Sequence, residues 1–280
     1  MKVLPFKIPK PEKEALIYQE DTGAIFYDQL HQHEEIQISY IVKGRGTLII
    51  GDSINDFKED DIFVIGENIP HVFRTDRNFS SSSEMLTLFF TKNSFGKDFF
   101  NLTDMSNIDD FFKKSEYGMK VLSKKEKIAL SFFKLSKQNK IQRISSLLKI
   151  LNQIIFAETS PLSSFVNRKK YTEDEGRRMN DVFEYAISSF NEAITLEEVA
   201  EKANMTKNAF CRYFKKRTNK TFFQFLIEIR IENACKMLHH NKDLSISTIS
   251  ELSGFQDIAN FNRKFKELKG ISPSQFRTRF

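Results

Sequence analysis

The sequence predicts a multi-domain α+β protein, in which a small β-barrel with trailing helices precedes an all-α carboxy-terminal domain. Residues 24–90 contain short apolar runs separated by turn signals, which is typical of a barrel or sandwich. After about residue 98 the hydrophobic period becomes helical. The last third contains helix caps, and one basic helical segment is repeated there. A chain of 280 residues is long enough for two domains with separate cores.

Composition and charge narrow the class of protein. The chain has 40% hydrophobic and 29% charged residues, and its apolar runs are too short to cross a bilayer. Residues 1–5 do not begin a secretory signal, and Cys211 and Cys235 match no metal or redox spacing, so we expect a reduced, cytoplasmic protein without a membrane partner. The net charge of +6 is uneven, because residues 206–280 hold 15 Lys+Arg against 6 Asp+Glu. This imbalance indicates a polyanionic partner or a solvated basic surface.

The first strands are predicted from alternation and turns. A turn at residues 43–46 precedes one apolar run, a turn at 51–52 follows it, and another strand is expected at 62–65. One apolar face of period two is formed by Ile36, Ile38, Tyr40 and Val42.

Helices are predicted to follow the barrel. Ser123-Lys124-Lys125-Glu126 has the pattern of a capping box. A helical stripe farther along must be buried, either on the barrel or against a second copy of the chain in a homodimer. The stripe consists of Ile141, Ile144, Leu147, Leu148, Ile150, Leu151, Ile154 and Ile155. The predicted domains are 1–97 for the barrel, 98–156 for a helical packing or dimerisation segment, 157–173 for a linker, and 174–280 for the helical domain.

The carboxy-terminal third is predicted to form short helices in succession. Thr195-Leu196-Glu197-Glu198 is a second capping box, and Asn204 is expected in a left-handed conformation at the following turn. Thr206 can cap the next helix. A long helix near 221–240 ends at a break near 241–245, and one face of it contains Phe223, Ile227, Ile231, Ala234 and Leu238.

Two segments of this domain, 210–215 and 261–266, share the pattern Phe-x-Arg-x-Phe-Lys. Each follows a small residue, Ala200 or Ser250, by about ten positions. Two Phe at i and i+4 pack a helix onto its neighbour, while Arg and Lys project from the opposite side. A short helix, a tight turn and a basic second helix form a helix-turn-helix unit, sized for the major groove of DNA.

Residues 175–280 closely resemble the AraC/XylS family of transcription regulators. The most specific matches are Gly254-Phe255-Gln256-Asp257, Phe261, Arg263, Phe265-Lys266, Gly270-Ile271-Ser272-Pro273 and Phe276-Arg277. The resemblance implies two helix-turn-helix units, joined by one long helix, that contact successive major-groove segments. A helix of about 20 residues spans about 30 Å, comparable with the roughly 34 Å between successive groove faces. Asn219, Asn204 and Ser250 depart from the usual Gly, Gly and Ala, and each is compatible with the fold.

The resemblance also assigns DNA contacts. Base-reading positions fall on Asn208, Cys211 and Arg212 in a first recognition helix near 206–217, and on Ala259, Asn262 and Arg263 in a second near 257–269. Asn pairs with adenine and Arg with guanine, each worth about 1–3 kcal/mol of discrimination, whereas Cys and Ala offer only apolar contact. The basic side chains expected to contact phosphates are Lys207, Lys215, Lys216, Arg217, Lys264 and Lys266. Any of these residues could instead be a solvated surface residue.

The amino-terminal region resembles the cupins. His31-Gln32-His33, Gln37 and Gly44 are similar to the first cupin motif, and residues 60–71 to the second. The resemblance places His31, His33, Gln37 and His71 at one end of the barrel. Metal-binding cupins hold an ion there with imidazoles and a carboxylate, but Gln37 replaces the Glu. We therefore expect the cluster to bind a small-molecule effector without a metal cofactor. One alternative is that His31, His33 and His71 bind a metal, and another is that the cluster binds no ligand.

These features predict a sequence-specific DNA-binding transcription regulator controlled by an effector that changes the packing or dimerisation of residues 98–156. No catalytic residue is assigned, because the sequence contains no other nucleophile or paired-acid constellation. A metal-dependent cupin enzyme with an accessory DNA-binding domain is the main alternative, and a constitutive architectural protein is a third. Activation and repression are both compatible with the sequence.

Overall fold

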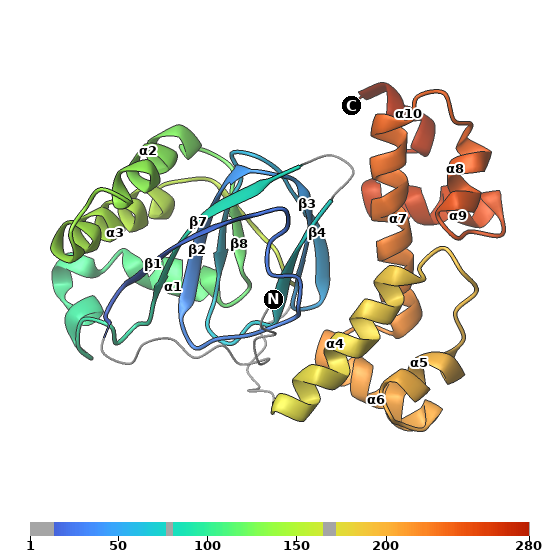
Figure 1. The fold of residues 1–280 in the computed structure, drawn as a ribbon, viewed down its shortest axis with the longest axis horizontal. Helices are drawn as coiled ribbons and strands as arrows, with labels where there is room; N and C mark the ends of the chain where they lie inside the picture. The colour runs from blue at the N-terminus through green and yellow to red at the C-terminus, as the bar shows by residue number, and fades with distance from the viewer. Residues whose placement is uncertain (1–13, 77–80, 165–171, 280) are drawn as a thin grey trace. The chain divides into compact units, whose positions relative to one another are not determined.

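The computed structural model describes residues 14–76, 81–164 and 172–279. The chain separates into two compact units, Met1–Glu173 and Asp174–Phe280. The first unit is β-rich and the second is entirely helical, which confirms the predicted α+β class (Figure 1). Within the described ranges, no helix is long and apolar enough to cross a membrane.

Two antiparallel sheets form the first unit. The strand order is β1-β7-β2-β5-β8-β9 in the larger sheet and β4-β3-β6 in the smaller one. The predicted strands at 36–42, 48–50 and 62–65 are confirmed, whereas the polar edge strand β1 and the three-residue strands β8 and β9 were not predicted. The bounds are β1 Ile17–Gly23, β2 Ile36–Lys43, β3 Gly46–Ile50, β4 Ser53–Phe57, β5 Ile62–Ile65, β6 His71–Thr75, β7 Ser83–Phe90, β8 Met119–Val121 and β9 Thr159–Pro161.

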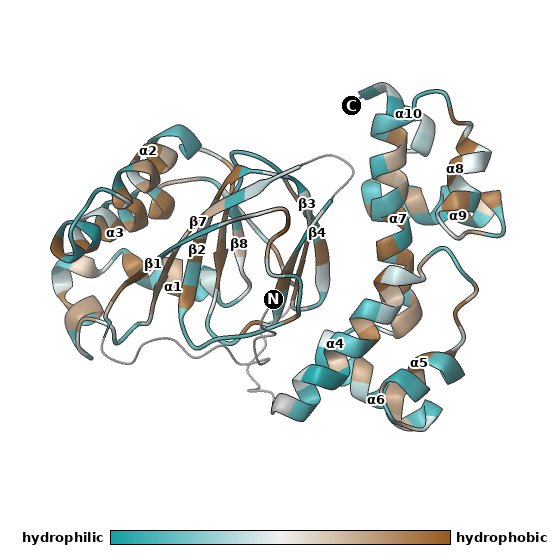
Figure 2. Cartoon of the chain, in the orientation of Figure 1, coloured by the Kyte–Doolittle hydropathy of each residue, from teal (hydrophilic) through white to brown (hydrophobic). Residues whose placement is uncertain are grey.

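The two faces of β2 belong to different cores. Ile36, Ile38 and Tyr40 pack under the helices that follow the barrel, in the larger core of the unit. Ile41 points to the other face and packs with residues of the smaller sheet, such as Phe73. Figure 2 shows hydrophobic residues along strands of both sheets. The side of β2 that faces the smaller sheet therefore also carries the alternating polar residues of this strand.

The trailing helices are α1 Ile108–Ser115, α2 Lys125–Leu135 and α3 Lys140–Ile155, preceded by two short 3-10 turns, Phe99–Asn101 and Thr103–Met105. Four residues of the predicted stripe lie in the larger core of the barrel unit, whereas Ile141 is 79% exposed. Internal packing therefore explains the buried half of this stripe. The buried stripe residues are Leu147, Ile150, Leu151 and Ile154.

The predicted capping box at Ser123 is wrong. Helix α2 begins after Lys124, which has a left-handed conformation and provides no side-chain cap. The Ser123 hydroxyl instead accepts a hydrogen bond from the backbone N–H of Glu158, at 2.8 Å. A capping box does occur at the next helix, where Asn139 and Gln142 cap each other's backbone N–H groups.

Residues 157–164 belong to the barrel unit, so the prediction that a linker starts at 157 is wrong. Strand β9 pairs with β8, which extends the larger sheet. Beyond β9, the hydroxyl of Ser163 and the backbone N–H of Ser164 donate to the buried carboxylate of Asp52, at 2.7 and 3.0 Å. Residues 165–171 of the predicted linker lie outside the described residues.

Buried Asp61 ties the trailing helices to the barrel. Its carboxylate accepts from Lys120 of β8 at 2.7 Å and from Lys125 of α2 at 2.8 Å. It also accepts from the backbone N–H of Lys58, at 3.1 Å. A buried carboxylate is tolerated when it is paired and hydrogen-bonded, as here. This network joins the start of β5 to the segments that follow the barrel.

The second unit consists of seven helices over the described residues. Thr195 and Glu198 form the predicted capping box, and Thr206 caps the next helix, as predicted. The break near 241–245 is confirmed, but Phe223 is 42% exposed and Phe222 is buried in its place. The bounds are α4 Glu173–Ser188, α5 Leu196–Lys202, α6 Lys207–Thr218, α7 Phe222–His240, α8 Ile246–Leu252, α9 Ile258–Lys269 and α10 Pro273–Arg279.

Candidate functional site

Two helix-turn-helix units, α5–α6 and α8–α9, lie on either side of α7 in the chain. In α6, Phe210 and Phe214 are fully buried, and in α9 the same is true of Phe261 and Phe265. The ring centroids are 5.7 Å apart in both pairs. This agreement follows from the i, i+4 spacing, which places both rings on one face of each helix.

Further aromatic residues fix each pair from behind. The rings of Phe210 and Phe214 lie 5.8 and 5.6 Å from that of Phe222, at the start of α7. In the second unit, Phe261 contacts Phe255 of the turn, at 5.2 Å, and Phe265 contacts Phe276 of α10, at 5.5 Å. In both units the second helix is therefore held by rings from the turn or from the helix that follows it.

The turns have the predicted backbone conformation. Asn204 and Asn219 both have positive φ, at 51° and 55°, as do Gly254 and Gly270 at the matching places of the second unit. Asn is the residue that best tolerates this conformation after Gly. The departures from glycine in the first unit therefore leave its turns intact.

The outer faces of α6 and α9 are solvent-exposed. All six residues predicted to contact bases are exposed: Asn208, Cys211 and Arg212 on α6, and Ala259, Asn262 and Arg263 on α9. Arg263 also donates to the side-chain oxygen of Asn260, at 2.8 Å, which orients its guanidinium along the helix. The exposed face of each helix thus presents an Asn and an Arg.

The lysines predicted to contact phosphates differ in their surroundings. Lys215, Lys216 and Lys266 are exposed on α6 and α9. Lys207 is exposed but donates to Glu197 of α5, and this hydrogen bond raises the pKa of Lys207. Lys264 is only partly exposed and pairs with Glu267, at 2.8 Å. Three of the lysines are therefore available without breaking an ion pair within the described residues.

The prediction that Arg217 contacts a phosphate is wrong. Arg217 is 6% exposed and its guanidinium donates to the carboxylate of Glu175 on α4. It also lies over the ring of Tyr213, at 5.4 Å. Arg217 therefore joins α4 to α6 inside the unit. The pattern of basic residues could not reveal this, because the partner lies 42 positions earlier in the chain.

In the first unit, the structure brings His31, His33, Gln37 and His71 together. His31 and His33 precede β2, Gln37 lies on β2 and His71 begins β6. The backbones of His31 and His71 exchange two hydrogen bonds, of 3.1 and 2.9 Å. One nitrogen from each of the three imidazoles lies within 4.8 Å of the others, and all four side chains are buried.

Backbone carbonyls fix the imidazole rings. The Nδ1 atoms of His31, His33 and His71 each lie 2.8 Å from a carbonyl oxygen, of Gln29, Glu35 and Ile69 respectively. A carbonyl only accepts, so each Nδ1 carries the hydrogen and each Nε2 is left to interact within the cluster. The Nε2 atoms of His33 and His71 lie 3.0 and 3.1 Å from Oε1 of Gln37.

A hydroxyl relay holds the amide of Gln37. Its Nε2 donates to Oγ of Ser39 at 2.8 Å, and this hydroxyl lies 3.0 Å from that of Thr87. Ser39 and Thr87 are directly opposite each other on β2 and β7. Sequence reasoning missed both residues, although their signal is visible: they are polar positions that alternate with apolar ones on two strands.

The cluster fits a divalent cation. Three imidazole nitrogens and an amide oxygen are a donor set for a transition metal, and metal-bound His commonly donates its other N–H to a backbone carbonyl, as here. His31, His33, His71 and Gln37 would hold the ion. A bound ion would act as a Lewis acid toward a ligand in the barrel.

Comparisons with known proteins give two domain matches. Residues 21–81 match the family model of the cupin domain, and residues 199–279 match that of a helix-turn-helix domain. The chain is 26% identical to the Msm operon regulatory protein of Streptococcus mutans over 242 residues, which cover 86% of this chain and 83% of that protein. It is 22% identical to the uncharacterized HTH-type transcriptional regulator YdeC of Bacillus subtilis over 272 residues, covering 90% and 86%.

One similar solved structure is that of the DNA-binding domain of AdpA, the global transcriptional factor, in complex with a target DNA. The sequence identity is 27%, the TM-score is 0.33, and the match covers 35% of this chain and 86% of that chain.

We predict that Gln37→Glu binds Co²⁺ at least about tenfold more tightly than the unchanged protein, because it adds an anionic ligand beside three imidazoles. Titration of the purified full chain, followed by visible absorption of the Co²⁺ complex, measures the two affinities. Gln256→Glu is the matched control, because it adds the same charge at an exposed position of the helical unit. Equal affinities for all three proteins would show that the four side chains do not converge on one ion.

Proposed function

We propose that this chain, an AraC-family transcription regulator with an amino-terminal cupin domain, recognises specific DNA sequences under the control of a small molecule bound in the barrel. The observation that carries the proposal is the duplicated geometry of α6 and α9. Each helix has a buried phenyl pair on one side and an exposed Asn and Arg on the other. Such a regulator acts in the cytoplasm, where the DNA is.

Base recognition is assigned to the exposed faces of these helices. Arg212 and Arg263 can donate bidentately to guanine, and Asn208 and Asn262 can pair with adenine. Cys211 and Ala259 can only make apolar contacts, such as one with a thymine methyl group. Since α6 and α9 each offer one Arg and one Asn, we assign both helices a role in specificity.

Phosphate contacts are assigned to the exposed lysines. Lys215, Lys216 and Lys266 flank the base-reading faces, and they can fix the position of the protein on the duplex without reading sequence. Lys207 and Lys264 can join them only by exchanging a carboxylate partner for a phosphate. Arg217 has no part in this interface, because it is buried against α4.

We predict that Arg212→Ala and Arg263→Ala together remove specific DNA binding and leave the fold intact, because both side chains are exposed. Each lost guanine contact should cost about 1–3 kcal/mol, so the loss of both should lower the affinity roughly a thousandfold. Fluorescence anisotropy on a duplex selected from a random library by the unchanged protein measures this. Unchanged affinity of the double variant would contradict the assignment.

The salt dependence of binding and a control variant complete that experiment. For the unchanged protein, the logarithm of the association constant should fall linearly with the logarithm of the salt concentration. The slope should be about −0.9 for each phosphate that the protein neutralises. Lys127→Ala removes an exposed cation from α2 in the barrel unit, and it should leave both affinity and slope unchanged. Circular dichroism of all variants checks that the helices remain folded.

The effector site is assigned to the histidine cluster. His31, His33, Gln37 and His71 form a buried polar group, backed by Ser39 and Thr87, in a barrel whose core also contains apolar and aromatic side chains. A buried imidazole Nε2 accepts a hydrogen bond, so we assign the site to small molecules that present hydroxyl or N–H donors. Control of DNA binding then requires that the molecule bind two arrangements of the protein with different affinities.

We predict that an effector raises the melting temperature of the unchanged chain and has no such effect on His33→Ala. A ligand at a hundred times its Kd stabilises by about 2.7 kcal/mol. Differential scanning fluorimetry of the full chain against a library of sugars, phenols and organic acids finds such compounds. His240→Ala, in the helical unit, is the control and should respond like the unchanged chain. A compound that stabilises His33→Ala equally would place the site elsewhere.

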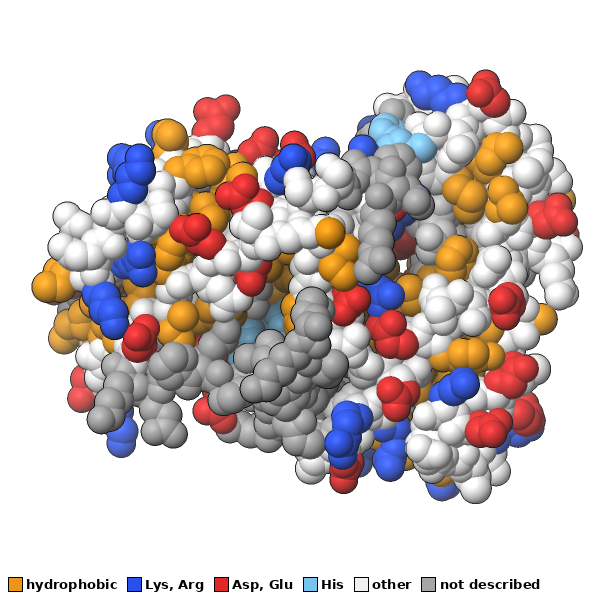
Figure 3. Space-filling view, in the orientation of Figure 1, with side chains coloured by type: hydrophobic (Ala, Val, Ile, Leu, Met, Phe, Trp, Pro, Cys, Tyr) orange, Lys and Arg blue, Asp and Glu red, His pale blue; other side chains and the backbone are white. Residues whose placement is uncertain are grey.

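A homodimer is supported by the exposed apolar side chains of α2 and α3. Leu130, Phe133 and Ile141 are 61%, 49% and 79% exposed. Figure 3 shows hydrophobic side chains on the surface over these helices. Exposed apolar side chains that gather into one patch are typical of protein–protein contacts, and we assign these three to such a patch.

We predict that Ile141→Asp converts a dimer into a monomer, because the new carboxylate would be desolvated in the interface. Light scattering of the eluted full chain measures the mass of each variant. Leu252→Asp changes a similarly apolar exposed residue on α8 of the helical unit and should stay dimeric. A monomeric unchanged chain, or a dimeric Ile141→Asp variant, would contradict this interface.

A further inference from the structure

The two halves of the helical unit approach each other beside the middle of α7. The first half contains α4–α6 and the second half contains α8–α10. A cleft of about 1050 Å³ opens between them, lined by the loop before α5, one side of α7, and the α8–α9 segment. Where the cleft lies, open space separates the halves. Contacts at its wall therefore contribute strongly to their relative orientation.

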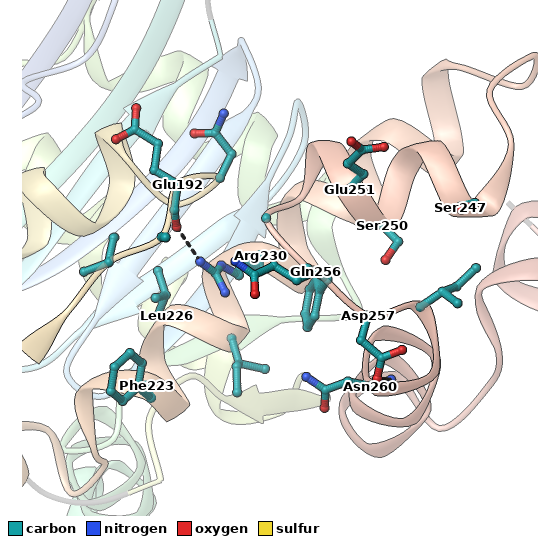
Figure 4. A pocket seen from close by; sticks show the side chains of 17 residues that line it. Glu192, Phe223, Leu226, Arg230, Ser247, Ser250, Glu251, Gln256, Asp257 and Asn260 are labelled. Atoms are coloured by element: carbon teal, nitrogen blue, oxygen red, sulfur yellow. Dashed lines mark hydrogen bonds between the residues drawn. The ribbon is translucent and has the colours of Figure 1, made fainter.

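One such contact is made by Arg230. From α7, its Nε donates to the carbonyl of Phe190 at 2.7 Å, and its Nη2 donates to the carbonyl of Glu192 at 2.8 Å. Figure 4 shows Arg230 in the cleft with its bond to Glu192. The guanidinium also lies 5.9 Å from the ring centroid of Phe255, in the turn of the second half. A single side chain thus joins the loop of the first half to the turn of the second.

Gly254 brings the two backbones into direct contact at the same place. Its φ is +84°, and a Cβ there would lie 2.6 Å from the carbonyl oxygen of Phe190 and 2.9 Å from Nε of Arg230. A side chain is therefore excluded by space as well as by conformation. The matching residue of the first half, Asn204, has the same left-handed conformation and an exposed side chain. The second turn is thus pressed against the other half of the unit.

Partial burial of the Arg230 guanidinium has a free-energy cost, and no other side chain reproduces its hydrogen bonds. Burial lowers the pKa of its guanidinium, so the hydrogen bonds must offset a desolvation cost. Two fork-shaped N–H groups meet two carbonyls of one loop, a geometry that the single ammonium of Lys does not reproduce. Long helices curve gently, so we assign Arg230 a share in fixing the angle between the halves that α7 joins.

From these contacts we propose that Arg230 is a positioning residue, which fixes the orientation of α6 relative to α9 and so sets the spacing of the two DNA segments that the protein recognises. The inference rests on the proposed function, because α6 and α9 are its recognition helices. Arg230 itself contacts no base in this scheme. Its effect is on the match between protein and duplex geometry.

The orientation can be measured without DNA. Spin labels at Lys216→Cys and Glu267→Cys, in a full chain that also carries Cys211→Ser and Cys235→Ala, report the distance between the ends of α6 and α9. We expect one narrow distance distribution with Arg230 present, and a clearly broader or shifted one in Arg230→Ala. Lys236→Ala, another cation on α7, is the matched control and should leave it narrow. An equally narrow distribution in Arg230→Ala, at the same distance, would overturn the proposal.

The consequence for DNA is measured as tolerance of altered spacing. A duplex selected from a random library by the unchanged protein is compared with versions that carry one or two extra base pairs between the contacted segments. Insertion should weaken binding of the unchanged protein roughly tenfold or more, as a lost half-contact would. In Arg230→Ala the penalty should fall to about threefold or less, with Arg230→Lys between the two. The same penalty in all variants would contradict the proposed role.

The two measurements separate this inference from the function on which it rests. If the unchanged protein selects no duplex, the DNA-binding proposal fails, while the spin-label distances still test whether Arg230 orients the halves. If it selects a duplex and Arg230→Ala keeps the full spacing penalty, the DNA-binding proposal stands and the role of Arg230 is refuted. Gly254→Ala provides a second variant, which should relax the spacing penalty in the same direction as Arg230→Ala.

Discussion

Burial of a phenyl pair in each of the helices α6 and α9 is the constraint on which the helical unit depends. Phe210 and Phe214 are fully buried, as are Phe261 and Phe265, and each buried ring contributes about 1.5–3 kcal/mol. The pair also decides what the helix presents to solvent. Arg212 lies two residues from both rings of its pair, about 200° away from each around the helix, and therefore must face outward. The exposed face that carries Arg212 is thus a geometric consequence of the core.

In the barrel, the same constraint acts through the alternation of side chains along a β-strand. Ile36, Ile38 and Tyr40 face the trailing helices, so Gln37 and Ser39 must face the other side of the sheet. Buried polar groups are tolerated when they are hydrogen-bonded, and this condition explains the relay from Thr87 through Ser39 to the amide of Gln37, whose Oε1 lies 3.0 Å from Nε2 of His33. Because one face of β2 is committed to the apolar core, the polar residues of this strand lie on its other face and form the cluster there.

Local chemistry was predictable from sequence, and long-range pairing was not. The cap at Thr195 and the left-handed turn at Asn204 depend on neighbouring residues, and both are present. Ser123 failed as a cap because a backbone group 35 positions away, at Glu158, takes its hydroxyl. Arg217 looked like a surface cation until Glu175 of α4 was placed beside it.

The histidine cluster was predictable from the sequence only in part. A motif brought His31, His33, Gln37 and His71 together, but it gave no indication of the hydroxyl pair behind them. Similarly, the contrast between Asn204 and Gly254 is visible in the sequence, where it appears as a tolerated substitution. Its physical reason is the carbonyl of Phe190, which leaves no room for a Cβ at the second turn. A residue whose identity is constrained by backbone atoms far away in the chain can therefore be explained only once the fold is known.

Effector control, as proposed, also has a structural requirement within the barrel unit. His71 pairs with Ile50 across β6 and β3, and the turn after Ile50 contains Asp52, whose carboxylate holds Ser163 and Ser164. These two serines are the last described residues before the segment that leads to the helical unit. A ligand that moves His71 acts on β6. The paired strand β3 ends at Ile50, two residues before Asp52. Such a path couples the sites only if the turn has two arrangements that the ligand distinguishes.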